Sequence, residues 1–309
     1  MRVSGQPYVV MRDLSYAPRV GNAHRMDLYL PPEAAGPCPV VVWSAGSAWL
    51  ADNGNTGGER VARALCGRGY AVAAVAVRSS GQARFPAQVH DGKAAVRWSR
   101  ANAARYGLDA DRIAVMGNSS GGWLASMLGA TAGVVALEGD LGPTSVSSEV
   151  QAVVDLYGPT DFLLMDRHMP EGALERFNQI TGGSRGHDDA VSPESRLIGA
   201  EIQAVPGRVA EADPSRWVRR GGPPWLILHG TADPLVPFHQ SELLLAALER
   251  AGVPATLYEM SGRVHEHDYL DEASDFTPRR VRHAAGGSVV GQAPATWELI
   301  ADFLDAALR

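Results

Sequence analysis

Hydrophobic residues along this chain follow two alternating patterns. Short runs rich in valine, isoleucine, leucine and alanine alternate with longer stretches in which apolar residues recur every three or four positions. Side chains repeat every two residues in a strand and about every 3.6 residues in a helix, so the runs indicate buried strands and the stretches indicate amphipathic helices. Their alternation predicts βαβ units, which build a mostly parallel, doubly wound α/β sheet.

The predicted elements cover most of the chain. We expect strands at residues 25–30, 40–43, 71–77, 113–116, 150–157, 225–228 and 255–259. We expect helices at residues 59–68, 85–106, 240–251 and 295–308, with a further helix that starts near residue 122. This order is typical of an α/β domain with helices on both faces of the sheet.

The strand rhythm stops between residues 160 and 223. That stretch contains Gly182-Gly183, several prolines and only short helical patterns. Ligands of open parallel sheets bind beyond the carboxyl ends of the strands, so an insertion at this point would lie over a binding site. We therefore expect residues 1–309 to form a single domain in which residues 160–223 are an inserted cap or lid.

Composition and charge exclude several classes of partner. The chain has 309 residues, of which 45% are hydrophobic and 20% are charged, and these values are those of an ordinary globular protein. The formal net charge of −6, without a long run of either sign, provides no basic surface for nucleic acid or an anionic membrane. The densest basic cluster, Arg279–His283, is short, and we interpret it as a solvated face.

Three further features predict a cytoplasmic protein. The longest apolar stretch, Tyr70–Val77, is far shorter than the roughly 20 residues that a membrane span needs. The N-terminal stretch Met1–Pro7 lacks the apolar core of a secretion signal. Cys38 and Cys66 have no metal-ligand spacing and cannot form a disulfide framework.

A serine lies between two glycines directly after one of the predicted strands. Residues Gly117–Gly121 read G-x-S-x-G, follow the strand at 113–116 and precede a predicted helix. Such a junction is a nucleophile elbow, in which the glycines permit a tight turn and the serine hydroxyl points outward. A turn without catalytic function would use the same residue types, so Ser119 is a candidate nucleophile that needs partners.

Candidate partners for Ser119 follow two later strands. A serine hydroxyl needs a base, and the base needs an acid that orients it. After a nucleophile elbow these partners come later in the sequence, in the order Ser, Asp or Glu, His. Asp233 follows one strand, and His265 and His267 follow the next. Asp233 could also cap a turn, and we interpret His229, at the end of the earlier strand, as a structural histidine.

Hydrolysis at Ser119 would also need N–H groups that bind an oxyanion. These come from the residue after the nucleophile and from a loop after an early strand. Small residues follow the strand at 40–43, so we expect the amides of Gly46, Ser47 and Ser120 as donors. A small-residue turn without further function is the alternative. The H-x-H-D spacing at 265–268 lacks a third cluster of ligands, and we expect no metal.

Several segments outside the elbow match a known pattern. Residues 26–31 contain D-x-Y-x-P, and residues 84–98 contain F-P-A-x-x-x-D-x-x-x-A-x-R-W. Together with the elbow, these segments resemble the carboxylesterases of the α/β-hydrolase superfamily, which include hormone-sensitive-lipase-like enzymes and bacterial feruloyl or acetyl esterases. The resemblance spans about residues 25–270, with further similar landmarks at residues 106–113, 157–161 and 223–226.

The resemblance implies an α/β-hydrolase fold and a catalytic triad. The nucleophile falls on Ser119, the acid on Asp233 and the base on His265, with His267 as second choice. The oxyanion loop departs from the family, because H-G-G-x-W is replaced by A-G-S-A-W at Ala45–Trp49. This replacement removes a histidine that normally braces the loop through hydrogen bonds.

These features together predict a serine esterase that acts on a small acyl or aryl ester through an acyl-enzyme. We expect no cofactor, no nucleic-acid or membrane partner, and a small-molecule ester as substrate; the patterns do not indicate an oligomeric state. Hydrolysis of an amide or formamide, acyl transfer, and non-catalytic binding are the alternatives. Candidate pocket walls are aromatic residues near strand ends, which are equally often core residues: Trp49, Phe85, Trp123 and Phe162.

Overall fold

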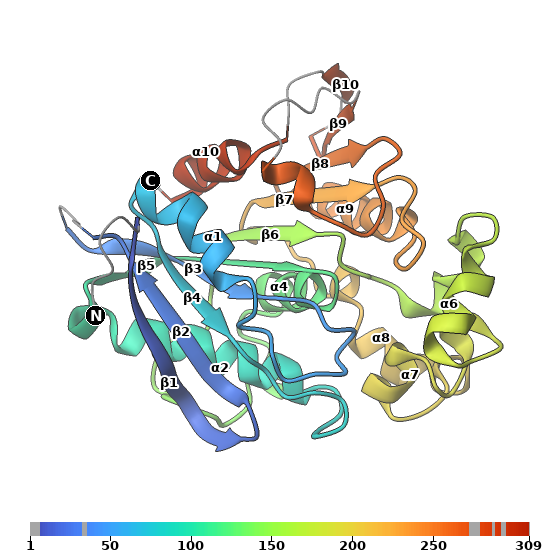
Figure 1. Ribbon diagram of the computed structural model, residues 1–309, viewed down its shortest axis with the longest axis horizontal. Helices are drawn as coiled ribbons and strands as arrows, with labels where there is room; N and C mark the ends of the chain where they lie inside the picture. The colour runs from blue at the N-terminus through green and yellow to red at the C-terminus, as the bar shows by residue number, and fades with distance from the viewer. Residues whose placement is uncertain (1–6, 33–35, 272–278, 286–287, 292–294, 309) are drawn as a thin grey trace.

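A ten-stranded sheet runs through the described part of the molecule. The computed structural model describes residues 7–32, 36–271, 279–285, 288–291 and 295–308. The strand order is β1-β2-β4-β3-β5-β6-β7-β8-β9-β10. Neighbouring strands from β4 to β8 are parallel, whereas the pairings at both edges are antiparallel (Figure 1). The mostly parallel sheet confirms the predicted fold class.

The inner strands overlap the predicted ones, although β5 begins at Leu108, earlier than expected. Residues 1–6, which belong to the stretch considered for a secretion signal, lie outside the described residues. The strands are β1 (Val9–Val20), β2 (Ala23–Leu30), β3 (Cys38–Ser44), β4 (Ala71–Val75), β5 (Leu108–Asn118), β6 (Ala152–Leu156), β7 (Trp225–Gly230), β8 (Ala255–Met260), β9 (Arg279–His283) and β10 (Ser288–Gly291).

Three strands at the sheet edges are not indicated by the sequence patterns. Most residues of β1 are half-buried or exposed, so its hydrophobic pattern is weak. Strand β9 consists of the basic cluster and pairs with β8, a pairing that the sequence did not indicate. The Arg280 side chain is 58% exposed, in keeping with the expected solvated face. Arg282 Nη1 of the same strand lies 2.5 Å from Glu242 Oε1 on α9 (His239–Ala251).

Helices cover both faces of the sheet. Helices α1 (Gly58–Leu65) and α10 (Trp297–Leu308) pack on one face, and α2 (Ala87–Ala101), α4 (Ser120–Ala130) and α9 pack on the other. Strand β4 is therefore buried on both sides, which explains its continuous apolar character. Shorter helices are α3 (Ala103–Tyr106), α5 (Val135–Glu138) and the 3-10 helices Cys66–Arg68 and Asp268–Asp271. None of the helices in the described ranges has the length and apolar character that crossing a membrane requires.

The chain between β6 and β7 forms short helices beyond the strand ends (Figure 1). Trp123 on α4 holds this segment to the body, because its Nε1–H donates to the carbonyl of Ala212 at 2.7 Å. Its elements are α6 (Ala173–Thr181), α7 (Pro193–Ile198), α8 (Pro206–Glu211) and the 3-10 helices Phe162–Leu164, Asp166–His168, Gly186–Asp188, Ile202–Ala204 and Pro214–Arg216.

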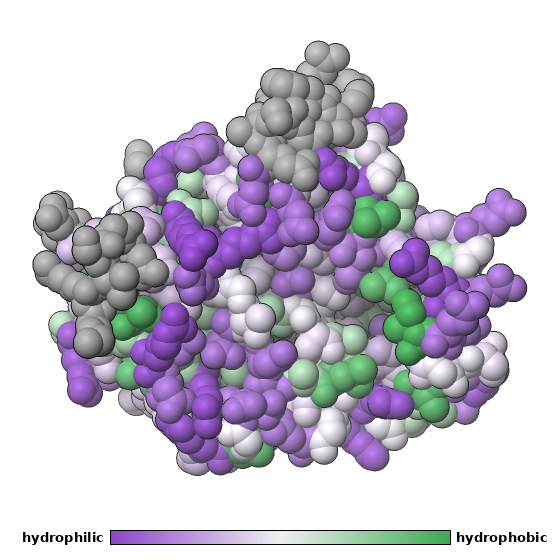
Figure 2. All heavy atoms as spheres, in the orientation of Figure 1, coloured by the Kyte–Doolittle hydropathy of each residue, from purple (hydrophilic) through white to green (hydrophobic). Residues whose placement is uncertain are grey.

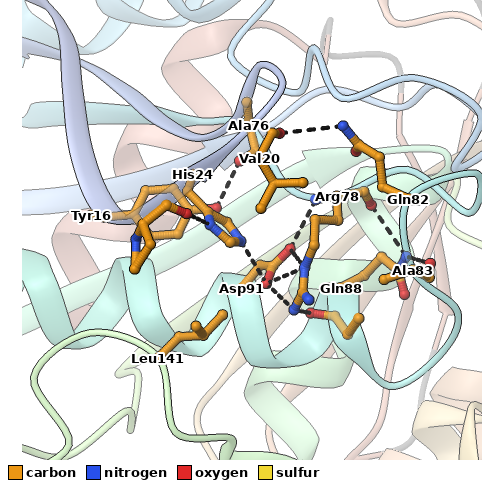
Figure 3. Close-up of polar contacts among 12 residues, drawn as sticks. Tyr16, Val20, His24, Ala76, Arg78, Gln82, Ala83, Gln88, Asp91 and Leu141 are labelled. Atoms are coloured by element: carbon orange, nitrogen blue, oxygen red, sulfur yellow. Dashed lines mark hydrogen bonds and ion pairs between the residues drawn. The ribbon is translucent and has the colours of Figure 1, made fainter.

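A buried ionic network fixes the loop after β4 (Figure 3). Asp91 on α2 is fully buried and accepts hydrogen bonds from Arg78, including one from Nη2 at 2.6 Å and one from the backbone N–H at 2.8 Å. His24 Nε2 lies 3.0 Å from the same carboxylate, and its Nδ1 faces the Pro18 carbonyl. Burial would lower the pKa of His24, but Asp91 and Pro18 outweigh it and raise that pKa. Residues after β4 are thereby tied to α2 and β2.

Candidate active site

Ser119 occupies a strained turn between β5 and α4. Its backbone has φ 54° and ψ −125°, a conformation that non-glycine residues rarely adopt. A Cβ at Gly117 would lie 2.3 Å from the Gly121 carbonyl oxygen, and a Cβ at Gly121 would lie 2.0 Å from the Ser44 carbonyl oxygen. Both glycines are therefore required by close backbone contacts, and together they place Ser119 at the N-terminus of α4.

His265 joins Ser119 to Asp233. The Nε2 atom of His265 lies 2.9 Å from Ser119 Oγ, and its Nδ1 lies 2.7 Å from Asp233 Oδ2. Because a carboxylate only accepts, Nδ1 carries the proton, and the Nε2 lone pair can accept the serine hydroxyl. The structure thus brings together the three side chains that the sequence indicates, from the loops after β5, β7 and β8.

Asp233 is fully buried and accepts hydrogen bonds at both oxygens. The N–H groups of Leu235 and Val236 donate to Oδ1 at 2.8 and 2.9 Å. His229 Nε2 lies 3.2 Å from Oδ2, the oxygen that His265 also contacts. Burial would raise the pKa of Asp233, but the hydrogen bonds from His229 and His265 outweigh it and hold that pKa well below its ordinary value.

His229 contributes more to the site than the sequence indicates. It is buried, its Nε2 also lies 3.0 Å from the Val236 carbonyl, and its Nδ1 lies 2.7 Å from Ser241 Oγ. A carbonyl only accepts, so Nε2 carries the proton and donates toward Asp233 as well. The H-G-x-x-D spacing at 229–233 is the sequence signal that could have identified this support.

His267 forms a hydrogen bond with Tyr157, whereas Ser119 is bonded to His265. The Nδ1 atom of His267 lies 2.5 Å from Tyr157 Oη, and burial lowers the pKa of this histidine to about 4. The Tyr157 hydroxyl donates its hydrogen bond to the neutral His267 ring, so Tyr157 Oη can accept one from Asn118 Nδ2 at 3.3 Å. The Tyr157 ring also packs against His265, with centroids 4.6 Å apart. This arrangement favours His265 over His267 as the base.

The oxyanion loop is bonded to the elbow through side chains. The Gly46 N–H donates to Asn118 Oδ1 at 3.0 Å, and the Ser47 N–H donates to Ser120 Oγ at 2.9 Å. Two of the three amides expected as oxyanion donors are therefore engaged. Within the described residues, the amides of Ala48 and Ser120 have no hydrogen-bond partner. The Asn118 side chain thus holds the loop in place, a function that the resemblance assigns to the histidine that is missing here.

Ser119 and His265 lie in a cavity of about 450 Å³. Figure 2 shows a hollow on this face, flanked by hydrophobic residues beside the region of α6 and α7. Among the described residues, no group of three or more histidine, cysteine or acidic side chains is arranged to hold a metal ion. Apolar side chains dominate the walls, and many come from the segment between β6 and β7 or from the Asp233 loop: Trp49, Leu50, Phe177, Ile180, Val191, Leu235 and Val236.

Only one of the four aromatic residues expected in the pocket borders this cavity. Trp49 lines it, whereas Phe85, Trp123 and Phe162 pack behind Trp49 in the core. The ring centroids of Trp123 and Phe162 lie 5.3 and 5.4 Å from that of Trp49. Edge-to-face packing buries these rings together and leaves the wall to residues of the segment between β6 and β7, whose hydrophobic periodicity is too weak to indicate them.

The fold and this geometry define the class of the protein. A strained serine at a strand–helix turn, hydrogen-bonded to a histidine and a buried aspartate at the carboxyl ends of a parallel sheet, is the arrangement of the α/β-hydrolases. Residues 26–248 match the family model described as BD-FAE. The chain therefore belongs to the BD-FAE family of α/β-hydrolase esterases.

Individual relatives agree with this assignment. The chain is 31% identical over 238 residues to "Esterase LipC" of Mycobacterium tuberculosis, a match that covers 77% of this chain and 55% of LipC. A truncated carbohydrate esterase from gut microbiota is 29% identical, with a TM-score of 0.78 over 98% of both chains. A bifunctional GH43-CE protein of Bacteroides eggerthii is 32% identical, with a TM-score of 0.79 over 97% of this chain and 35% of its own.

Proposed function

We propose that the protein hydrolyses a small carboxylic ester through an acyl-enzyme on Ser119. The observation that carries this proposal is the continuous hydrogen-bonded line from Ser119 through His265 to Asp233 in a mostly apolar cavity. The names of the relatives, which are esterases, support the same reaction class. The matched part of the chain covers little more than half of LipC. The proposal therefore concerns the reaction at the Ser119 site of this chain and not the activity of the whole relative.

Acylation follows from the orientation of the histidine. His265 Nε2 accepts the proton of Ser119 as Oγ attacks the ester carbonyl, and Asp233 stabilises the imidazolium that forms. The imidazolium then gives this proton to the departing alcohol. In the second half-reaction His265 activates a water molecule, which releases the acid and restores Ser119.

The oxyanion of the tetrahedral intermediate needs backbone N–H donors. Amides that already form hydrogen bonds within the protein are less available for this role. The side chains of Asn118 and Ser120 accept hydrogen bonds from the amides of Gly46 and Ser47. The backbone N–H groups of Ala48 and Ser120 are therefore favoured as oxyanion donors. Ala48 has φ 51° and borders the cavity with Ser119. The function of Gly46 is then to allow close approach, because a Cβ there would lie 2.6 Å from Ser119 Cβ.

Residues 160–223 act as a cap in this proposal. Their side chains Phe177, Ile180 and Val191 form one wall of the cavity and would contact the acyl or alcohol part of the ester. An apolar wall of this kind favours an uncharged chain or ring next to the scissile bond. We also propose a reducing, cytoplasmic location, in keeping with the buried free thiols of Cys38 and Cys66.

Covalent labelling tests the nucleophile. A fluorophosphonate should modify Ser119, and peptide mass mapping should find the adduct on that residue because only an activated serine reacts rapidly. Ser119→Ala should abolish labelling, and Ser126→Ala, at a buried serine of α4, should not. Labelling at another serine, or no labelling at all, would contradict the proposal.

Matched substrates test the reaction type. The protein should hydrolyse a p-nitrophenyl ester much faster than the corresponding p-nitroanilide, and added alcohol should not divert the acyl group. Preference for the anilide would instead indicate an amidase, and ester formation with the alcohol would indicate an acyltransferase.

A further inference from the structure

A second depression adjoins the active-site cavity. It has a volume of about 500 Å³ and is lined by residues of the loop after β4 and of the chain around α7. Leu50 and Arg196 border both this depression and the cavity that contains Ser119. A substrate that extends past Leu50 therefore leaves the apolar cavity and enters the second depression.

Two arginines face this depression without a counter-ion. Arg84 and Arg196 both line it and are exposed. Neither forms an ion pair with any residue that the structure describes. The one acidic residue in the lining, Glu201, is already paired with Arg185 at 2.6 Å between Oε1 and Nη2. Two like charges on one concave surface repel each other, and a bound anion relieves that repulsion.

The backbone around Arg84 is held in place. The Ala83 N–H donates to the Ser79 carbonyl at 3.0 Å on one side of Arg84. On the other side, the Phe85 N–H donates to the Leu197 carbonyl at 2.9 Å, and Leu197 follows Arg196 in α7. The two segments that carry the arginines are therefore bonded to each other, which reduces the entropy lost when both side chains bind one ligand.

Neighbouring residues also suit a polar ligand. A Cβ at Gly199 would lie 2.3 Å from Cδ of Arg84, so the glycine leaves the space that this side chain occupies. Ser195 lines the depression, and its buried hydroxyl has no hydrogen-bond partner within the described residues. An unpaired hydroxyl in the wall can donate a hydrogen bond to an oxyanion.

We propose that the depression is a subsite for a carboxylate of the substrate, bound by Arg84 and Arg196. This inference rests on the proposed ester hydrolysis at Ser119 and specifies its substrate: an ester that carries a free carboxylate several bonds beyond the apolar group next to the carbonyl. Guanidinium groups bind carboxylates through paired, charge-assisted hydrogen bonds, which an uncharged ester group cannot form.

A series of half-esters tests the subsite. The substrates are mono-p-nitrophenyl esters of succinate, glutarate, adipate and suberate, each compared with its methyl ester at the far carboxyl. For at least one length, kcat/KM for the free acid should exceed that for the methyl ester by about tenfold or more. Arg84→Gln and Arg196→Gln should each remove most of this preference, measured as the ratio of kcat/KM for the free acid to kcat/KM for its methyl ester.

Arg176→Gln provides the matched control. Arg176 is exposed on α6 in the same segment and lines neither cavity, so its removal changes the net charge equally without touching the subsite. The preference should survive in this variant. A preference that is absent at every length, or that falls equally in Arg176→Gln, would overturn the subsite.

Binding to Ser119→Ala separates this inference from the proposed reaction. Calorimetry should show that monomethyl adipate binds more tightly than dimethyl adipate, and Arg196→Gln should weaken binding of the monoacid about tenfold. Equal binding of both compounds overturns the subsite even if Ser119 is an active nucleophile. Tight binding of the monoacid, without hydrolysis of any ester by the native protein, overturns the proposed reaction and leaves the subsite in place.

Discussion

Each oxygen of the Asp233 carboxylate accepts two hydrogen bonds, and half of these come from the main chain. A buried acid with this many donors stays ionised and fixed in direction, so it can hold His265 in one tautomer. Ser119, at the other end of the hydrogen-bonded triad, is held in place by different interactions. Ser119 is positioned by backbone strain and close glycine contacts, and its hydroxyl has His265 as its hydrogen-bond partner among the described residues.

The two histidines of the β8 loop should differ strongly when each is replaced by alanine. His265→Ala removes the group that accepts the Ser119 proton, and kcat on p-nitrophenyl acetate should fall by at least about a thousandfold. His267→Ala removes the acceptor of the Tyr157 hydroxyl and a ring that packs near Trp43, but no group bonded to Ser119, and its effect on kcat should be about tenfold or less. Equal losses in the two variants would contradict the assignment of the base.

The Tyr157 hydroxyl should matter for rate more than for substrate affinity. It links His267 to Asn118, and Asn118 holds the Gly46 amide in the oxyanion loop. Tyr157→Phe should therefore lower kcat roughly tenfold with little change in KM, because the loop stabilises the transition state. Tyr106→Phe, at a tyrosine that stacks on Trp98 and precedes the opposite end of β5 from Ser119, is the control and should leave kcat unchanged. A rise in KM alone would contradict this role.

At the level of elements, the site is assembled from loops at the carboxyl ends of neighbouring parallel strands. Strand β3 leads to the oxyanion loop, β5 to the elbow, β7 to the acid and β8 to the base, while Tyr157 follows β6. Their register in the sheet brings together residues that lie far apart in the sequence. The elbow tolerates little change, because backbone atoms surround both of its glycines.

A methyl group at the elbow should destabilise the fold. Gly121→Ala would place a Cβ 2.0 Å from the Ser44 carbonyl oxygen, so β3 and α4 must separate. The free energy of unfolding, measured by urea denaturation, should fall by at least about 2 kcal/mol. Gly67→Ala is a matched control, since a Cβ there meets nothing within 4 Å. Similar stability in both variants would show that the contact relaxes without cost.

Sequence patterns predicted those elements whose side chains are buried on both faces. Strands β3 to β7 contain continuous apolar runs, and Ser119 and Asp233 follow such runs at strand ends. Strand β8, which precedes His265, is half-buried and is indicated by its β-branched and aromatic residues instead. Edge strands β1 and β9 bury few side chains, so no hydrophobic period indicates them. The burial of Phe85, Trp123 and Phe162 depends on ring packing between distant segments, which no local pattern contains.

For the whole molecule, the balance of buried charge sets the response to pH. Burial keeps His267 neutral in the folded protein, with a pKa of about 4 instead of the ordinary 6.5. As pH falls, His267 therefore binds a proton at a higher pH in the unfolded chain than in the folded protein. Its contribution to stability is complete above pH 6.5 and is lost progressively between pH 6.5 and 4.

Replacement of His267 should flatten this part of the stability profile. Over the window from pH 6.5 to 4, the native protein should lose up to about 3 kcal/mol more unfolding free energy than His267→Gln. Urea denaturation at several pH values in this window provides the measurement. Parallel profiles for the two proteins would show that the histidine takes up its proton equally in both states.

The attachments of the segment between β6 and β7 have a consequence for how this protein can change over evolutionary time. Trp123 and Phe85 in the body donate to the carbonyls of Ala212 and Leu197, which are main-chain groups of the segment. Every residue type supplies a carbonyl, so side chains there can drift while these two attachments persist. New specificities can therefore arise by exchanging residues 160–223 between relatives, with the hydrolytic machinery inherited unaltered.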